Sequence, residues 1–188
     1  MKKILLLSVW LVATIMVYAQ EAGKGIKFLD NEPWEEVVKT AKKQRKLIFV
    51  DCYTSWCGPC KKLAAEVFTQ KDVGDYVNKK FVSVKYDVEK PNGLEFARKY
   101  RELISAFPTL LLIRPDGSVM QRIVGAFPAE EILEAIQNGV DGKTWQALEK
   151  EYLNGKRDYD FVMTYLDLLL KSGENEKYAD VKRAYVKQ

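Results

Sequence analysis

Two short stretches of the sequence consist almost wholly of apolar residues, and they constrain the possible fold more than any other feature. They are residues 47–50 and 109–113. A strand with one face in water alternates apolar and polar residues, whereas a continuous apolar run is typical of a strand buried on both faces. Helices must then cover each side of the sheet, so the two runs predict a layered α/β domain.

The surrounding sequence alternates strand-like and helix-like segments. Further strands are expected at residues 26–29, 81–86 and 118–124. Helices are expected at residues 31–45, 63–68, 72–78, 93–100 and 128–138. Asn31 is expected to cap the first of these helices and Gly139 to end the last. The order β-α-β-α-β-α-β-β-α predicts a mixed sheet with helices on both faces.

The sequence contains three cysteines and no histidine. The absence of imidazole excludes a Ser-His-Asp triad, a Cys-His nucleophile pair and a histidine metal site. Three cysteines complete a four-ligand zinc site only if carboxylates help, so we expect no metal. The chemistry of this protein must therefore use Cys, Asp, Glu, Lys or Tyr.

Residues 1–19 predict a secretory signal peptide with cleavage after Ala19. Two lysines precede an apolar run at residues 4–17, and small residues occupy the cleavage positions. The run is shorter than the roughly 20 residues of a spanning helix, so no stable membrane span is expected after cleavage; an uncleaved anchor is the alternative. The mature protein would be periplasmic or secreted, in an oxidising compartment. Its formal charge falls from +4 to +2 without Lys2 and Lys3, which argues against nucleic-acid binding.

The first apolar run is followed by the pentapeptide Trp56-Cys57-Gly58-Pro59-Cys60. Two cysteines three residues apart at a helix start lie about one turn apart, which allows a disulfide. The ring is small, so the bond stabilises little and suits a reversible redox switch. The helix dipole favours a Cys57 thiolate, while Cys60 is expected to be more buried and to act as the resolving thiol. A structural disulfide or half of a metal knuckle is the alternative, although no second C-x-x-C is present.

Phe107-Pro108-Thr109 introduces the second apolar run. With the pentapeptide, it makes residues 26–140 resemble the thioredoxin superfamily, in particular exported bacterial thioredoxin-like proteins. The resemblance implies a thioredoxin-like domain at residues 20–140, with a mixed central sheet flanked by helices. It also implies thiol-disulfide oxidoreductase activity.

The resemblance gives roles to two charged residues. Asp51 matches a buried carboxylate behind the disulfide that shuttles a proton for the resolving cysteine, and it is also the best available general base. On its sequence context alone, Asp51 would be a strand-end or capping residue. Lys85 matches a lysine near that carboxylate, with a solvent-facing strand lysine as the alternative.

The resemblance also implies a substrate-binding surface. Pro108 matches a proline that is cis and faces the cysteines, whereas sequence alone favours trans. The backbone of Phe107 would pair with an extended client segment. Trp56, Gly58 and Pro59 complete this surface, with Trp56 either an exposed platform or simple packing.

Cys52 lies outside the motif. Strand alternation turns it to the face opposite Asp51, which predicts a buried, inert thiol. A regulatory or intermolecular partner is the alternative.

Residues 141–188 form a C-terminal α-helical extension that the resemblance leaves unexplained. Three helices are expected, at residues 144–154, 158–171 and 174–187. The middle helix has an apolar surface too broad to leave in water. Fewer than 50 residues rarely fold alone. We therefore expect the extension to pack on the thioredoxin-like core, another subunit or a partner.

Two functions follow from these observations. The first is an exported protein-disulfide reductase that cycles Cys57 and Cys60 between dithiol and disulfide. It would need an external thiol electron donor and no cofactor beyond its redox-active disulfide. The alternative is a binding or assembly module whose helical tail holds a partner. The Gly58-Pro59 dipeptide goes with reducing proteins in the family, and residues 61–107 leave no room for an inserted helical domain.

Overall fold

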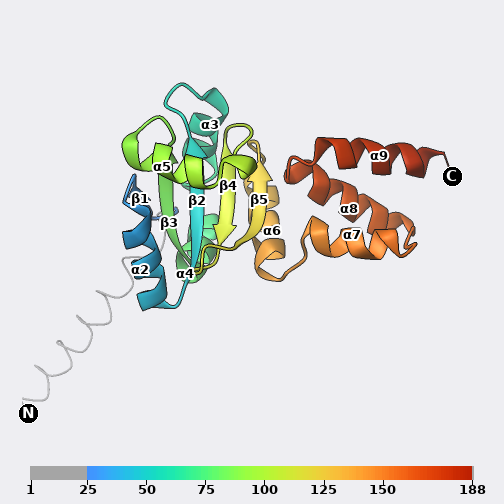
Figure 1. Cartoon of the computed structure of the whole chain (residues 1–188), viewed down its shortest axis with the longest axis horizontal. Coiled ribbons are helices and arrows are strands. Elements are labelled where there is room, and N and C mark those ends of the chain that lie inside the picture. The colour runs from blue at the N-terminus through green and yellow to red at the C-terminus, as the bar shows by residue number, and fades with distance from the viewer. Residues whose placement is uncertain (1–24, 188) are drawn as a thin grey trace, which may run out of the picture.

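The computed structural model describes residues 25–187, so the predicted signal peptide lies outside the described residues. The strands are β1 (Phe28–Asp30), β2 (Leu47–Tyr53), β3 (Phe81–Asp87), β4 (Thr109–Ile113) and β5 (Val119–Val124). The helices that accompany them are α2 (Trp34–Gln44), α3 (Gly58–Glu66), α4 (Lys71–Lys80), α5 (Pro91–Lys99), the 3-10 turn η1 (Arg101–Leu103) and α6 (Ala129–Val140). The strands form one mixed sheet in the order β1-β3-β2-β4-β5, with helices on both faces (Figure 1). The predicted fold class is confirmed.

The central strand β2 is apolar on both sides because each of its faces meets a separate hydrophobic cluster. It runs parallel to β3 and antiparallel to β4. Val50 and Cys52 belong to the cluster that includes residues of α2 and α5. Phe49 belongs to the other, with residues of α3, α4 and α6. Alternation therefore places Asp51 on the α3 face, opposite Cys52.

Asn31 does not cap the first helix, contrary to the prediction. Helix α2 begins at Trp34, after Pro33 in the N-cap position. Asn31 instead adopts a φ of 50°, and its Oδ1 accepts a hydrogen bond from the backbone N–H of Asp87 (3.0 Å). Its carbonyl accepts another from the side chain of Asn92 (2.8 Å). Asn31 is thus bonded to the last residue of β3 and to α5, which are distant from it in sequence.

Gly139 does not end α6, which continues to Val140. A Cβ atom at position 139 would lie 2.7 Å from Cβ of Gln121 and 2.7 Å from Cδ1 of Leu112. The glycine therefore permits close packing of α6 on β4 and β5, a requirement that local sequence does not reveal.

Replacing Gly139 with alanine is expected to destabilise the protein by roughly 1–2 kcal/mol. Overpacking costs about 1–3 kcal/mol, which outweighs the gain in helix propensity of about 1 kcal/mol. Urea denaturation should show a lower midpoint with an unchanged slope. Asn138→Ala, one residue earlier in the same helix, serves as the control and should leave the midpoint near that of the wild type. Equal midpoints for both variants and the wild type would contradict this account of α6.

The extension contains the three expected helices, α7 (Trp145–Leu153), α8 (Tyr159–Lys171) and α9 (Asn175–Val186). The hydroxyl of Thr144 caps α7 and the carboxylate of Asp158 caps α8. Helices α8 and α9 share a small hydrophobic cluster, made of Phe161, Val162, Tyr165, Leu166, Leu169 and Val181. Helix α7 packs against it through Trp145, Leu148 and Tyr152. Most of the broad apolar face of α8 is thus covered by the other helices of the extension. The sequence had predicted packing on the core, another subunit or a partner, and had not indicated this internal cluster. Across residues 25–187, no helix is long and apolar enough to span a bilayer.

The extension meets the sheet at the end of α8, beside edge strand β5 (Figure 1). Arg122 Nε of β5 donates to the carbonyl of Ser172 (2.8 Å), and its Nη2 pairs with Glu174 Oε1 (2.6 Å). Lys171 Nζ lies 3.5 Å from Glu131 Oε2 of α6. These contacts hold the extension beside β5, which is an edge strand of the sheet.

Candidate active site

Cys57 and Cys60 form a disulfide at the start of α3, with their Cα atoms 5.3 Å apart. Cys57 is the N-cap residue, and its Sγ accepts a hydrogen bond from the backbone N–H of Cys60 (3.1 Å). Pro59 lies in the first helical turn, where the missing N–H would have had no helical partner. The backbone N–H of Cys57 donates to the carbonyl of Thr54 (3.2 Å), which closes the turn between β2 and α3.

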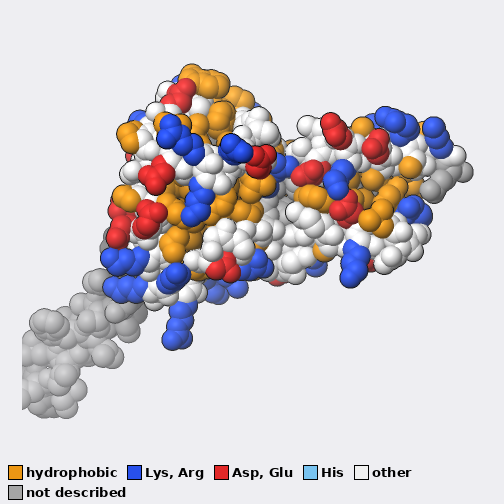
Figure 2. Space-filling view, in the orientation of Figure 1, with side chains coloured by type: hydrophobic (Ala, Val, Ile, Leu, Met, Phe, Trp, Pro, Cys, Tyr) orange, Lys and Arg blue, Asp and Glu red, His pale blue; other side chains and the backbone are white. Residues whose placement is uncertain are grey.

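The two cysteines are equally buried in this disulfide-bonded state, with exposed fractions of 4% and 5% for Cys57 and Cys60. The expectation that Cys60 is more buried is therefore wrong for this state, in which a bond joins the two sulfurs. Gly58 and Pro59 between them are exposed. Figure 2 shows hydrophobic side chains gathered at this tip of the domain, where Figure 1 shows the β2–α3 turn.

Asp51 lies behind the disulfide on the α3 face of β2. Its exposed fraction is 6%, and its Oδ1 has no hydrogen-bond partner among residues 25–187. Burial raises the pKa of Asp51 from 3.8 to about 7, against the opposing attraction of the Lys85 ammonium. Asp51, Cys60 and Lys85 line one cavity of about 150 Å³. The structure thus brings together a buried carboxyl and the second cysteine.

Lys85 lies opposite Asp51 in the register of β3 with β2. Its side chain is 39% exposed, and its Nζ lies 3.7 Å from Asp30 Oδ2 of β1. Both sequence interpretations therefore hold in part, because Lys85 borders the Asp51 cavity and also reaches solvent. The cavity includes Tyr53 and Lys61, which sequence reasoning did not select.

Aromatic side chains border the disulfide on its exposed side. Trp56 is 66% exposed, so it is a platform rather than core packing. Its ring meets that of Phe107 edge to face, with centroids 6.2 Å apart. The Phe107–Pro108 bond is cis, as the resemblance implied. The carbonyl of Pro108 accepts a hydrogen bond from Gly125 N–H (2.9 Å), which ties this loop to the end of β5.

Glu89 contributes to this surface and was not predicted. Its Oε1 accepts a hydrogen bond from Trp56 Nε1 (3.0 Å), which orients the indole. The signal in the sequence is only an acidic residue soon after the end of β3. Its contact with Trp56 spans 33 residues, so local pattern did not indicate it.

Cys52 is fully buried on the opposite face of β2, as predicted. Burial, with a smaller contribution from the Asp51 charge, raises the pKa of its thiol well above the usual range. Such a thiol forms almost no thiolate at neutral pH, so Cys52 is inert beside the disulfide pair.

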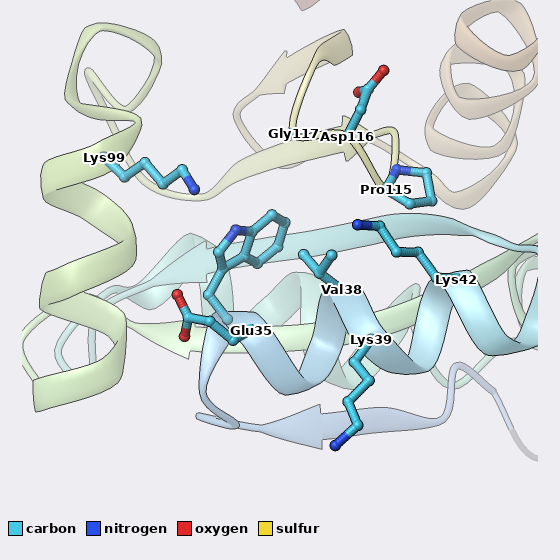
Figure 3. A pocket seen from close by; sticks show the side chains of 9 residues that line it. Glu35, Val38, Lys39, Lys42, Lys99, Pro115, Asp116 and Gly117 are labelled. Carbon is cyan, nitrogen blue, oxygen red and sulfur yellow. The ribbon is translucent and has the colours of Figure 1, made fainter.

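A separate hollow lies between α2, α5 and the turn from β4 to β5 (Figure 3). It measures about 550 Å³, and Lys42 and Lys99 extend toward it from α2 and α5. Lys99 Nζ lies 5.7 Å from the centroid of the Trp34 ring. None of the predicted site residues lines this hollow.

Comparison with known proteins identifies the family. The thioredoxin-like domain family matches residues 34–139, more than half of the chain. Thioredoxin Y2, chloroplastic, from Arabidopsis thaliana is 36% identical over 98 residues, which cover 52% of this chain and 54% of that protein. The thioredoxin of Echinococcus granulosus is 34% identical over 102 residues, which cover 53% of this chain and 87% of that protein. The chain belongs to the thioredoxin-like family.

Solved structures agree with this assignment. A candidate disulphide-isomerase from Bacteroides thetaiotaomicron is 45% identical, covers 63% of this chain and 95% of its own, and has a TM-score of 0.56. A thioredoxin from Thermus thermophilus is 25% identical, with 62% and 91% coverage and a TM-score of 0.53. The chain spans about half the length of the first curated relatives, and the family match ends at residue 139. The protein thus has a thioredoxin-like oxidoreductase fold with its cysteine pair in place.

Asp51→Asn is expected to increase stability at neutral pH and to remove a pH dependence. The folded protein keeps the Asp51 proton up to about pH 7, whereas the unfolded chain loses it near pH 3.8. The unfolded state therefore binds fewer protons between these values, and wild-type stability falls as pH rises through this window. The amide does not ionise, so the variant should gain up to about 4 kcal/mol relative to the wild type above pH 7.

Urea denaturation of the disulfide-bonded proteins between pH 5 and pH 8 measures this difference. Asp75→Asn is the control, because Asp75 is an exposed partner of Lys71 on α4. This control should keep the wild-type pH dependence. Parallel curves for Asp51→Asn and the wild type would contradict the assignment of a protonated, buried Asp51.

Proposed function

We propose that this protein is an exported thiol-disulfide oxidoreductase that reduces disulfides of client proteins. The observation that carries the proposal is the cavity shared by Cys60 and Asp51 behind the disulfide. A purely structural disulfide needs no buried proton acceptor, and an isolated buried carboxyl is costly for stability. The thioredoxin-like family membership and the small ring between the cysteines support the same conclusion.

The first step is attack by the Cys57 thiolate on one sulfur of a client disulfide. The client S–S bond breaks, a mixed disulfide with Cys57 forms, and one client thiolate leaves and takes a proton from water. Cys57 is suited to this step because it is the N-cap of α3. The N–H of Cys60 and the positive end of the helix dipole stabilise its negative charge.

The second step is resolution of the mixed disulfide by Cys60. Its thiol transfers a proton to the Asp51 carboxylate, and the Cys60 thiolate attacks Cys57 Sγ. The bond between Cys57 and the client breaks, the second client thiolate leaves, and the Cys57–Cys60 disulfide forms. Two electrons pass from the protein to the client. A carboxyl with a pKa near 7 suits this exchange because it can accept and return a proton at neutral pH.

The client surface of the proposal consists of the exposed groups around the disulfide. An extended client segment would pair with the backbone of Phe107 and pack against Trp56. The exposed Gly58 and Pro59 offer little steric obstruction beside Cys57. The reducing direction rests on the Gly58-Pro59 dipeptide and on residues 61–107, which α3, α4, β3, α5 and η1 already fill.

The remaining parts of the proposal concern cellular context. The signal-like pattern of residues 1–19 supports export to the periplasm or beyond, where a reductase must be recharged by an external thiol donor. Its partners are then disulfide-containing client proteins and that donor, with no nucleic acid. The cycle uses the cysteine pair and requires no bound cofactor or metal.

The proposed activity is tested by reduction of insulin disulfides with dithiothreitol as donor. The wild type should accelerate insulin precipitation, and Cys57→Ser should lower the rate to that of dithiothreitol alone, because the attacking thiolate is lost. Cys52→Ala removes the third cysteine and is the matched control, with turnover expected to match the wild type. A wild-type protein without turnover would instead favour the binding or assembly module.

The direction of electron flow is tested by thiol trapping in cells of the native host. Acid quenching followed by alkylation should find Cys57 and Cys60 mostly as free thiols if a donor keeps the protein reduced. A pair found almost wholly as a disulfide would contradict the reductase assignment. A small free-energy change can shift the reduction potential of the cysteine pair, since about 30 mV corresponds to about 1.4 kcal/mol for this two-electron couple.

A further inference from the structure

Three charged side chains lie in register across the sheet beside the redox site. Lys85 of β3 is paired with Asp30 of β1 on one side and with Asp51 of β2 on the other. Two residues earlier, the same register brings the rings of Phe28 and Phe49 within 6.0 Å, in the cluster beneath α3, α4 and α6. Because strand side chains repeat with a period of two, the acid–base–acid row lies on that same face. This is the face of Cys60.

Exposure to solvent increases outward along the row. Asp51 is 6% exposed, the Lys85 side chain 39% and the Asp30 side chain 62%. Lys85 Nζ lies 3.7 Å from Asp30 Oδ2. In the described part of the chain, its ion-pair partner is Asp30 and not Asp51. The ammonium group therefore pairs with the carboxylate at the outer end of the row, while its charge still acts on the buried carboxyl of Asp51.

We propose that Asp30 is a positioning residue for proton exchange at Asp51, because its carboxylate holds the Lys85 ammonium outward and limits its attraction for the Asp51 carboxylate. The inference rests on the proposed use of Asp51 by the cysteine pair. Asp30 does not touch the reacting sulfurs. It acts through Lys85, which sets how readily Asp51 keeps a proton.

The direct effect of Asp30 on Asp51 is weak by comparison. Two strand spacings separate these residues, or about 10 Å, which is close to the Debye length at physiological salt. Lys85 lies between them and interacts with both carboxyl groups. Removing Asp30 would free the ammonium to move inward, and loss of the negative charge would act in the same direction. Both effects favour ionised Asp51.

The other titratable groups that line the Asp51 cavity come from α3 and β2, whereas Asp30 lies on β1. Helix α3 contributes Cys60 and Lys61 to the cavity, and β2 contributes Tyr53. The residue of β4 opposite Asp51 is the apolar Leu110. Cys52 lies on the other face of β2, and burial keeps its thiol protonated at neutral pH. Burial is also the main cause that raises the pKa of Tyr53, so its phenol stays neutral.

The test compares Asp30→Asn, Lys85→Gln and the double variant in the full-length, disulfide-bonded protein. Carboxyl ¹³C NMR follows the titration of Asp51 directly. Asparagine keeps the oxygen that accepts a hydrogen bond from the Asn31 side chain, so the local turn is preserved. We expect Asp30→Asn to lower the Asp51 pKa by about half a unit, the size expected for a partly exposed charge pair.

Lys85→Gln should shift the Asp51 pKa upward, and adding Asp30→Asn to that variant should change it little further. Glu36→Gln is the control, because it removes an exposed carboxylate paired with Lys39 on α2; the Asp51 titration should not move. An unchanged or raised Asp51 pKa in Asp30→Asn would overturn the inference. So would an equal downward shift in the presence and absence of Lys85, because Asp30 would then act without positioning the lysine.

A kinetic measurement separates this inference from the proposed function. The rate at which Cys60 resolves a mixed disulfide on Cys57 is followed against pH in the wild type and Asp30→Asn. The midpoint of this pH profile should move to lower pH in Asp30→Asn, together with the Asp51 titration. If the NMR titration moves and the rate profile does not, the use of Asp51 in the cycle fails while the effect of Asp30 on Asp51 stands.

Discussion

Burial of one carboxyl on the central strand is the constraint on which the candidate site depends. Strand β2 lies between two hydrophobic clusters, and Asp51 enters one of them from a position otherwise suited to an apolar side chain. Desolvation favours the neutral acid, which explains a pKa near 7 and predicts a loss of stability as pH rises toward neutrality. The protein retains this destabilising group in a cavity that it shares with Cys60.

The two cysteines occupy a different electrostatic environment only a few residues away. The start of α3 presents free backbone N–H groups and the positive end of the helix dipole, which favour a thiolate at Cys57. The cavity behind them favours a protonated acid at Asp51. This contrast between a site that stabilises negative charge and one that resists it suits sequential attack by two thiols. The row of Asp51, Lys85 and Asp30 runs from the buried cavity to the exposed edge of the sheet.

The C-terminal extension adds a separate packing unit to this domain. Its helices share their own cluster. Arg122 of β5 bonds to Ser172 and Glu174 just after α8, and Lys171 pairs with Glu131 of α6. The extension packs beside edge strand β5, whereas the disulfide lies at the start of α3 (Figure 1). The extension therefore packs on β5, while the side chain of Trp56 near the disulfide remains exposed.

Sequence periodicity was sufficient for the strands, most helices and the cysteine pair, because these depend on contacts between near neighbours and on a pattern of burial. The resemblance added the cis bond before Pro108 and the position of Asp51. Tertiary contacts decided the rest: the Asn31 bond to the end of β3, the need for glycine at 139 and the Trp56–Glu89 bond. Each joins residues far apart in sequence, so its geometry exists only once the strands are in register and the helices are packed. The same register made Asp30 a neighbour of Lys85, which no local pattern indicated.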